Sequence, residues 1–194
     1  MNNDTSPIDP LFTEARSAVS FLDRPVSDEQ LQALYALCKW GPTSANCSPM
    51  RVVFVRSEAA RQRLLPCMSS GNRAKVQSAP VTALIGMDLE FYEQLPLLFP
   101  HTDARAWFVG KPEHIATTAL RNSSLQGAYL MLAARSLGLD CGPMSGFDAA
   151  LLEAEFWPGT TVKSNFVCAL GHADPATQHP RNPRLTFEQA CQLV

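Results

Sequence analysis

Three short runs of β-branched and apolar residues constrain this chain most strongly. They occupy residues 51–55, 81–87 and 161–170, and each has the length and composition of a buried strand. Strands that alternate with helices usually predict a doubly wound parallel sheet. No strand-to-helix turn carries G-x-G-x-x-G or G-x-x-x-x-G-K-[ST], however, so the sequence does not predict a dinucleotide-binding or P-loop fold.

Helix start and stop signals lie between these runs. Ser27 and Gln30 form a capping box before an apolar stripe that stops at residues 41–42. The longest predicted helix covers residues 113–137, and Gly138 is placed to end it. Shorter helices are expected at residues 10–21, directly after 57, at 148–156 and at 186–190.

Composition excludes several classes of function. A length of 194 residues predicts one domain, residues 1–194. The net charge is −2, so no basic surface for nucleic acid or an anionic membrane is predicted. The longest uncharged stretches, 76–87 and 122–134, are shorter than the roughly 18 apolar residues of a spanning helix. Residues 1–7 lack a basic stretch followed by an apolar one, which favours the cytoplasm over secretion.

The cysteines and histidines show no metal-ligand spacing. Six cysteines include no C-x-x-C pair, and the four histidines are scattered along the chain. We therefore predict no metal site, and we expect free buried thiols in a reducing compartment.

Several polar segments are candidates for a site. Residues 41–49 place hydroxyl and amide side chains between a helix end and a strand, although self-capping turns of Ser and Asn also explain this pattern. Asn72 and Lys75 stand three apart before the second predicted strand. Residues 143–148 predict a tight turn with exposed amides, and the glycines at 138, 142 and 146 are typical of turn chemistry.

Arginines near both ends of the chain form a further candidate. Arg16, Arg181 and Arg184 together could hold an anion. The alternative is that each is an ordinary solvated surface charge, and their separation in sequence does not decide between the two.

Taken in order, these segments resemble the flavin-dependent nitroreductase family. The matches are Arg-Ser at a helix end, a Pro-Thr-Ser-x-Asn-x-x-Pro loop, Asn-x-x-Lys before a strand, Ser-Gly-Phe-Asp, and a C-terminal Arg. Longer strings at residues 39–49, 91–101 and 142–148 resemble one branch, the malonic semialdehyde reductases of bacterial uracil degradation. The resemblance covers nearly the whole chain, and the string at 91–101 is peculiar to that branch.

The resemblance implies an α+β fold. Its mixed, mostly antiparallel central sheet would be flanked by helices, and two chains would intertwine as a homodimer with shared flavin sites. It also implies FMN as cofactor, NADPH or NADH as co-substrate, and a small aldehyde as substrate.

The cofactor-binding residues implied by the resemblance are spread over the chain: Arg16, Ser17, Pro42, Thr43, Ser44, Asn46, Asn72, Lys75, Pro143, Met144, Ser145, Gly146, Arg181 and Arg184. Arg16, Ser17 and Arg184 would hold the phosphate or ribityl end, and residues 42–46 would come from the other subunit. Lys75 would lie near N1 and O2 of the flavin, where it stabilises the charge that develops on reduction. The Gly146 N–H would point at N5, since a residue without a side chain allows close approach.

The implied activity is hydride transfer from NAD(P)H through flavin N5 to malonic semialdehyde, giving 3-hydroxypropionate. His101 is the candidate proton donor, and Arg105 or Arg121 is the candidate clamp for the substrate carboxylate. The alternative is that residues 100–105 form a lid whose charges pair with each other. Cys47 is expected to be structural, because hydride transfer needs no covalent adduct.

The chain departs from the family's N-terminal pattern. The family commonly has two adjacent basic residues and a third one three positions later, whereas Ala15, Arg16 and Val19 occupy those places here. Arg181 is the candidate for the compensating cation. Two other functions stay open from the sequence: a general nitroreductase or quinone reductase, and a flavin-binding domain without turnover.

Overall fold

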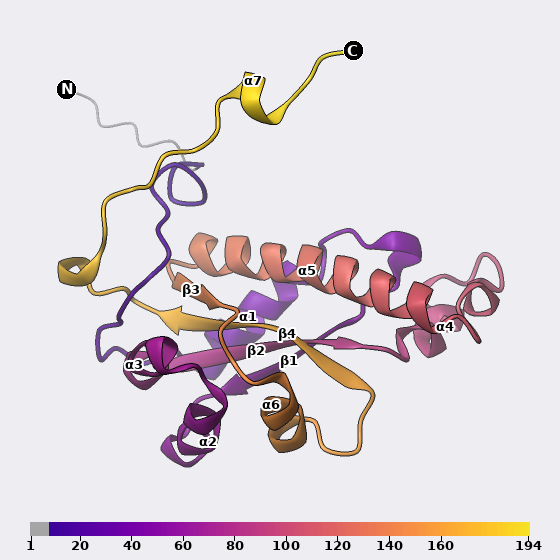
Figure 1. The fold of residues 1–194 in the computed structure, drawn as a ribbon, viewed down its shortest axis with the longest axis horizontal. Coiled ribbons are helices and arrows are strands. Elements are labelled where there is room, and N and C mark those ends of the chain that lie inside the picture. Colours follow the sequence, from indigo (N-terminus) through magenta and orange to yellow (C-terminus); the bar gives the residue numbers. More distant parts are fainter. Residues whose placement is uncertain (1–7) are drawn as a thin grey trace.

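The computed structural model describes residues 8–194 and shows an antiparallel sheet with helices on both faces (Figure 1). The four strands are β1 (Met50–Val55), β2 (Val81–Asp88), β3 (Asp140–Met144) and β4 (Val162–Gly171). Their order in the sheet is β1-β2-β4-β3, and each neighbouring pair is antiparallel. The predicted α+β class with a mostly antiparallel sheet is confirmed.

The helices are α1 (Asp28–Cys38), α2 (Glu58–Leu64), α3 (Ser70–Ser78), α4 (Leu95–Leu98), α5 (Pro112–Ser136), α6 (Ala149–Phe156) and α7 (Phe187–Ala190). The capping box of α1 is confirmed, because Gln30 N donates to Ser27 Oγ and Ser27 N donates to Gln30 Oε1. Gly138 ends α5 with a positive φ of 74°. Asp148 caps α6 through the N–H of Leu151 at 3.0 Å.

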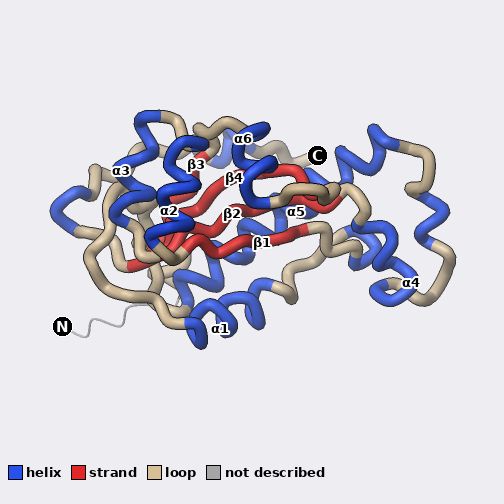
Figure 2. Tube along the Cα trace, turned by 90° about the horizontal axis from the view of Figure 1, so that it is seen from below, coloured by secondary structure: helices blue, strands red, loops and turns tan. Residues whose placement is uncertain are grey.

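The sheet lies between two layers of helices, so the fold has three layers (Figure 2). One apolar cluster joins α1 and α5 to the sheet, and a second joins α2, α3 and α6 to its other face. Strand β2 shows the expected alternation, since Ala83 and Ile85 belong to the first cluster and Leu84 to the second. A strand buried on both faces explains why residues 81–87 are so uniformly apolar.

Residues 89–111 form an excursion from this body. A third apolar cluster, which includes Phe91, Leu95 and Phe108, packs it against Cys47 of the loop that precedes β1. The excursion carries α4 and lies at the opposite end of the molecule from α3 in both views (Figures 1 and 2).

The predicted helix at residues 10–21 is wrong. The backbone makes turns from Ile8 to Glu14 and then runs along the sheet. Ala18 N donates to Cys141 O at 2.8 Å, and Leu22 N donates to His172 O at 2.8 Å. Pairing with the sheet therefore replaces the helical hydrogen bonds that the local pattern predicts.

The sequence signals do not predict α3 or β3. Helix α3 is mostly polar, and Val76 is its one buried residue. Strand β3 contains Gly142 and Pro143, residue types that are depleted in strands but tolerated at a sheet edge. The predicted turns are wrong here, because Gly142 lies within β3 and no turn is assigned at Gly146.

None of the helices in residues 8–194 is long and apolar enough to cross a membrane. The prediction that the chain starts without a secretion signal concerns residues 1–7, which lie outside the described residues. The cysteines of the described chain are all free; five are buried as predicted, and Cys191 is exposed.

Candidate functional site

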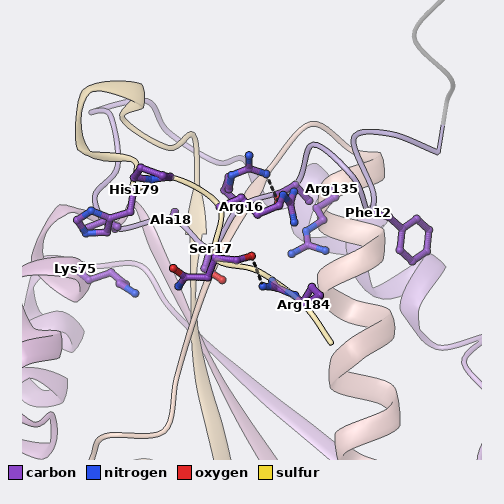
Figure 3. A pocket seen from close by; sticks show the side chains of 13 residues that line it. Phe12, Arg16, Ser17, Ala18, Lys75, Arg135, His179 and Arg184 are labelled. Carbon is purple, nitrogen blue, oxygen red and sulfur yellow. Dashed lines mark hydrogen bonds between the residues drawn. The ribbon is translucent and has the colours of Figure 1, made fainter. Parts of the chain in front are cut away.

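A cationic pocket of about 480 Å³ opens beside the β3 edge of the sheet. Its basic side chains come from four separate parts of the chain: Arg16, Lys75, Arg135, His179, Arg181 and Arg184. Figure 3 shows Lys75 approaching from one side and Arg135 of α5 from the other, with Ser17 between them. The structure thus brings together the arginines from both ends of the sequence.

Backbone pairing at the edge of the sheet positions the N-terminal side of this pocket. Ser17 forms a parallel bridge with Cys141 of β3, which fixes the direction of the neighbouring Arg16 side chain. Arg16 donates to the carbonyl oxygens of Glu14 and Ala15 at 3.2 Å each. Arg181 donates to the carbonyl oxygens of Thr13 and Ala15, which ties the C-terminal segment to the N-terminal one.

Positive charge in the pocket is not balanced by acidic side chains. Within residues 8–194, Arg16, Lys75, Arg135, Arg181 and Arg184 form no ion pair with Asp or Glu. Burial, followed by the charges of Arg16, Arg184 and Arg135, lowers the pKa of Arg181. Burial also lowers the pKa of Lys75. Such a cluster is stabilised by a bound anion.

Helix α3 presents Asn72 and Lys75 to the chain around β3. Asn72 Nδ2 donates to Gly146 O at 2.9 Å, and a Cβ on Gly146 would lie 2.8 Å from that nitrogen. A Cβ on Gly142 would lie 2.9 Å from Lys75 Cδ. A side chain at either place would displace Asn72 or Lys75 from its present position, so glycine favours this close approach of α3. The Gly146 N–H donates to no other group among the residues described, so it is available to a ligand.

An apolar pocket of about 310 Å³ lies next along β3. It is lined by Met131, Pro143, Met144, Ser145 and Phe166. Three of these residues directly follow Gly142, where an added Cβ would lie 2.9 Å from Cδ of Lys75 in the cationic pocket. A ligand with an anionic end and a flat apolar end matches this sequence of environments.

The predicted residues 42–46 do not join this site within one chain. They precede β1, which is the opposite edge strand from β3. Ser44 N donates to Asn122 Oδ1 at 2.8 Å, whereas Arg135 lines the cationic pocket. Thirteen residues separate Asn122 from Arg135 on α5 (135 minus 122), which corresponds to about 20 Å along the helix.

His101 and Arg105 are also remote, because they belong to the excursion at the α4 end (Figure 1). Arg105 makes two hydrogen bonds of 2.7 Å with Glu93, so its charge is already compensated. His101 is exposed, and its ring meets the ring of Phe99 edge-on at 5.4 Å. Arg121 lies exposed on α5.

Cys47 has the environment of a structural thiol. Its side chain is fully buried, and burial raises its pKa to about 11. A thiol held in this neutral form is a poor nucleophile. The described residues also contain no group of His, Cys, Asp and Glu that could hold a metal ion.

Comparison with known proteins decides the family. The family model described as "Nitroreductase family" matches residues 13–172. The chain belongs to the nitroreductase family. The match spans β1 to β4 and includes Arg16, Lys75 and Arg135 of the cationic pocket, but it ends before His179, Arg181 and Arg184.

Relatives within the nitroreductase family cover the whole length of the chain. A protein of Polynucleobacter asymbioticus is 58% identical over 95% of this chain and 94% of its own length. A protein of Ralstonia nicotianae is 55% identical over 98% of both chains. Both carry the description "Putative NADH dehydrogenase/NAD(P)H nitroreductase".

Solved structures of this family show the same fold. A protein of Exiguobacterium sibiricum 255-15, solved in complex with FMN, has a TM-score of 0.86 at 18% identity and covers 98% of both chains. A nitroreductase family protein of Streptococcus pneumoniae TIGR4 has a TM-score of 0.82 at 18% identity, covering 95% of this chain and 98% of that one.

The residues present fit FMN. Uncompensated cations suit a phosphate group, and the adjoining apolar pocket suits a flat ring. One polar atom supports the same conclusion, because Arg135 Nε is buried and has no hydrogen-bond partner. Sequence reasoning missed Arg135, since a basic residue in the last turn of a helix is common and belongs to no motif.

Proposed function

We propose that this nitroreductase-family protein is an FMN-dependent oxidoreductase that reduces malonic semialdehyde to 3-hydroxypropionate with NADPH or NADH. The observation that carries the flavin part is the cationic pocket joined along β3 to an apolar pocket and a free Gly146 N–H. The substrate part is supported by the resemblance of residues 91–101 to the malonic semialdehyde reductase branch.

The chain's own residues supply binding and electrostatics. FMN, when bound, would supply the two-electron carrier for hydride transfer from the nicotinamide to the aldehyde carbon. Arg16, Arg181 and Arg184 would hold the phosphate of FMN. Lys75 would place positive charge beside the pyrimidine edge, and the Gly146 N–H would donate to N5 and so orient the ring for transfer.

The proposed site needs residues from two copies of the chain. Residues 42–46, His101 and Arg105 lie far from the cationic pocket of their own chain. In the proposed homodimer they would meet the partner's pocket. Helices α1 and α5 offer apolar side chains for such an interface; Tyr35 is 56% exposed, Leu120 48% and Leu125 46%. In this arrangement His101 of one subunit reaches the substrate over the other subunit's flavin.

A second candidate is a broad nitroreductase or quinone reductase. The Arg105–Glu93 pair favours it, because an arginine already held by a carboxylate is less available for the substrate's own carboxylate. The description of the curated relatives as NAD(P)H nitroreductases points the same way.

A substrate comparison tests the proposed function. Purified protein should be yellow, and under aerobic conditions it should oxidise NADPH or NADH faster with malonic semialdehyde than with nitroaromatics or quinones. Higher kcat/KM for the nitroaromatics and quinones would select the second candidate. Colourless protein that takes up no FMN would exclude both candidates.

Arg105→Ala tests the carboxylate clamp. If Arg105 exchanges Glu93 for the substrate carboxylate, the variant should raise the KM for malonic semialdehyde by about tenfold or more, since a charge-assisted pair contributes about 1.5–3 kcal/mol. The KM for uncharged propanal should stay within about twofold. The matched variant Glu93→Gln leaves Arg105 in place and should not raise the semialdehyde KM. Equal effects of Arg105→Ala on both aldehydes would remove the clamp.

A further inference from the structure

Arg135 is exceptional among the described residues. Its Nε is the one buried side-chain nitrogen or oxygen in residues 8–194 that has no hydrogen-bond partner. Its Nη1 donates to Leu11 O at 2.9 Å, which holds the side chain in place. A buried donor without a partner is unfavourable unless a ligand completes it, and a guanidinium offers five N–H donors in a planar fork.

The position of Arg135 identifies the kind of ligand. Its side chain leaves the last turn of α5 and lines the cationic pocket together with Arg16, Arg181 and Arg184 (Figure 3). No Asp or Glu in the described part of the chain forms an ion pair with it. The unmet donor therefore belongs to a guanidinium that lines a pocket with the chemistry of a phosphate monoester site.

The neighbouring arginine is less free to act. Arg181 uses one nitrogen, Nη2, to donate to the carbonyl oxygens of Thr13 and Ala15. Ala15 and Val19 contribute no charge at the N-terminal side of the pocket. Arg135 therefore adds a cation from the core helix to a pocket whose N-terminal side contributes only the charge of Arg16.

We propose that Arg135 binds the phosphate of the flavin mononucleotide directly, and that it makes the pocket select phosphorylated flavin over riboflavin. This inference rests on the proposed flavin function. Arg135 is fixed to α5 and to the segment around Leu11, so its fork is already in place before the ligand enters.

Flavin titration of the apoprotein tests the proposal. The apoprotein is titrated with FMN and with riboflavin, and binding is followed by the quenching of flavin fluorescence. Arg135→Met should weaken FMN binding by about 10- to 100-fold and leave riboflavin binding within about twofold. Arg135→Lys, which keeps the charge but loses the fork, should recover part of the FMN affinity. Arg63→Met, at an ion-paired arginine on α2, is the matched control and should change neither.

Each outcome of the titration has a distinct meaning. Equal losses for FMN and riboflavin, or no loss for either, would overturn the role of Arg135. Failure of the wild-type apoprotein to bind either flavin would instead overturn the proposed function. If Arg135→Met does not fold, the same comparison with Arg135→Lys decides, since an unchanged ratio of FMN to riboflavin affinity would equally overturn the role.

A kinetic measurement separates FMN from the other phosphate source, the 2′-phosphate of NADPH. With FMN at saturation, the ratio of the KM values for NADPH and NADH should be the same in wild type and in Arg135→Lys. A selective rise in the KM for NADPH, with unchanged FMN affinity, would assign Arg135 to the nicotinamide cofactor and overturn the proposal.

Discussion

The two edges of the sheet differ in charge and in backbone strain. At the β3 edge, the cationic pocket gathers charges that have no acidic partner in the described chain and that repel each other. At the β1 edge, the loop before β1 is uncharged, and its backbone is strained instead. Ala45, Asn46 and Ser48 have φ values of 50°, 51° and 40°, a region that non-glycine residues rarely adopt.

Buried amides of α5 hold the strained loop. Asn122 Oδ1 accepts from Ser44 N at 2.8 Å, and Gln126 Oε1 accepts from Met50 N at 2.9 Å. Four of the five buried polar side chains in the described chain, those of Thr118, Asn122, Ser123 and Gln126, lie within this part of α5. The loop is thus held by hydrogen bonds within the described chain, whereas the cations of the pocket have no acidic partner there. Substitutions should therefore affect stability at one edge and binding at the other.

Gln126→Met should give the largest loss of stability. It removes the hydrogen bond to Met50 and leaves a buried N–H without a partner, which costs about 2–3 kcal/mol in the free energy of unfolding. Urea unfolding of the flavin-free protein measures this. Gln62→Met, at an exposed glutamine bonded to Glu58, is the control and should stay within about 0.5 kcal/mol. Equal losses in both variants would remove the special role of the α5 amides.

Arg184→Gln should show the opposite pattern at the pocket. Arg184 is exposed and, among residues 8–194, bonds only to the neighbouring carbonyl oxygens of Asn182 and Pro183, so its loss should change the free energy of unfolding by less than about 0.5 kcal/mol. FMN affinity should fall about tenfold, and the remaining affinity should depend less steeply on NaCl, because one screened charge is gone. A variant that is destabilised by about 2 kcal/mol but binds FMN normally would contradict the comparison.

The fold was predictable wherever local signals and tertiary packing agree. Three local signals each predict one kind of element, and the structure contains it. They are the capping box at Ser27, the apolar run of β2 and the glycine that ends α5. Residues 10–21 carry equally good helix signals, yet backbone pairing with Cys141 and His172 overrides them. That pairing joins segments more than 100 residues apart, so a local pattern cannot contain it.

The site was predictable only through residues that belong to a motif. Arg16, Asn72 and Gly146 belong to motifs that resemble the nitroreductase family. In the structure Arg16 lines the cationic pocket, and Asn72 donates to Gly146 O. Arg135 and Gln126 were missed because their importance comes from burial and from partners distant in sequence. Arginine in a last helical turn and glutamine in a mid-helix position are common in any helix, so their types alone predict nothing.

The alkylation rate of Cys47, which lies in the loop before β1, tests whether a substitution at either edge of the sheet loosens that loop. At pH 8 the exposed Cys191 should react with iodoacetamide at once, whereas Cys47 stays protected, because burial raises its pKa to about 11 and the thiolate is the reactive form. Gln126→Met should speed alkylation of Cys47 several-fold by favouring local opening of the loop, while Arg184→Gln should not. Mass spectrometry of peptides measures both rates, with the sheet-core Cys168 as internal control. If Cys47 and Cys168 accelerate together, the amides of α5 stabilise the whole fold and not the loop in particular.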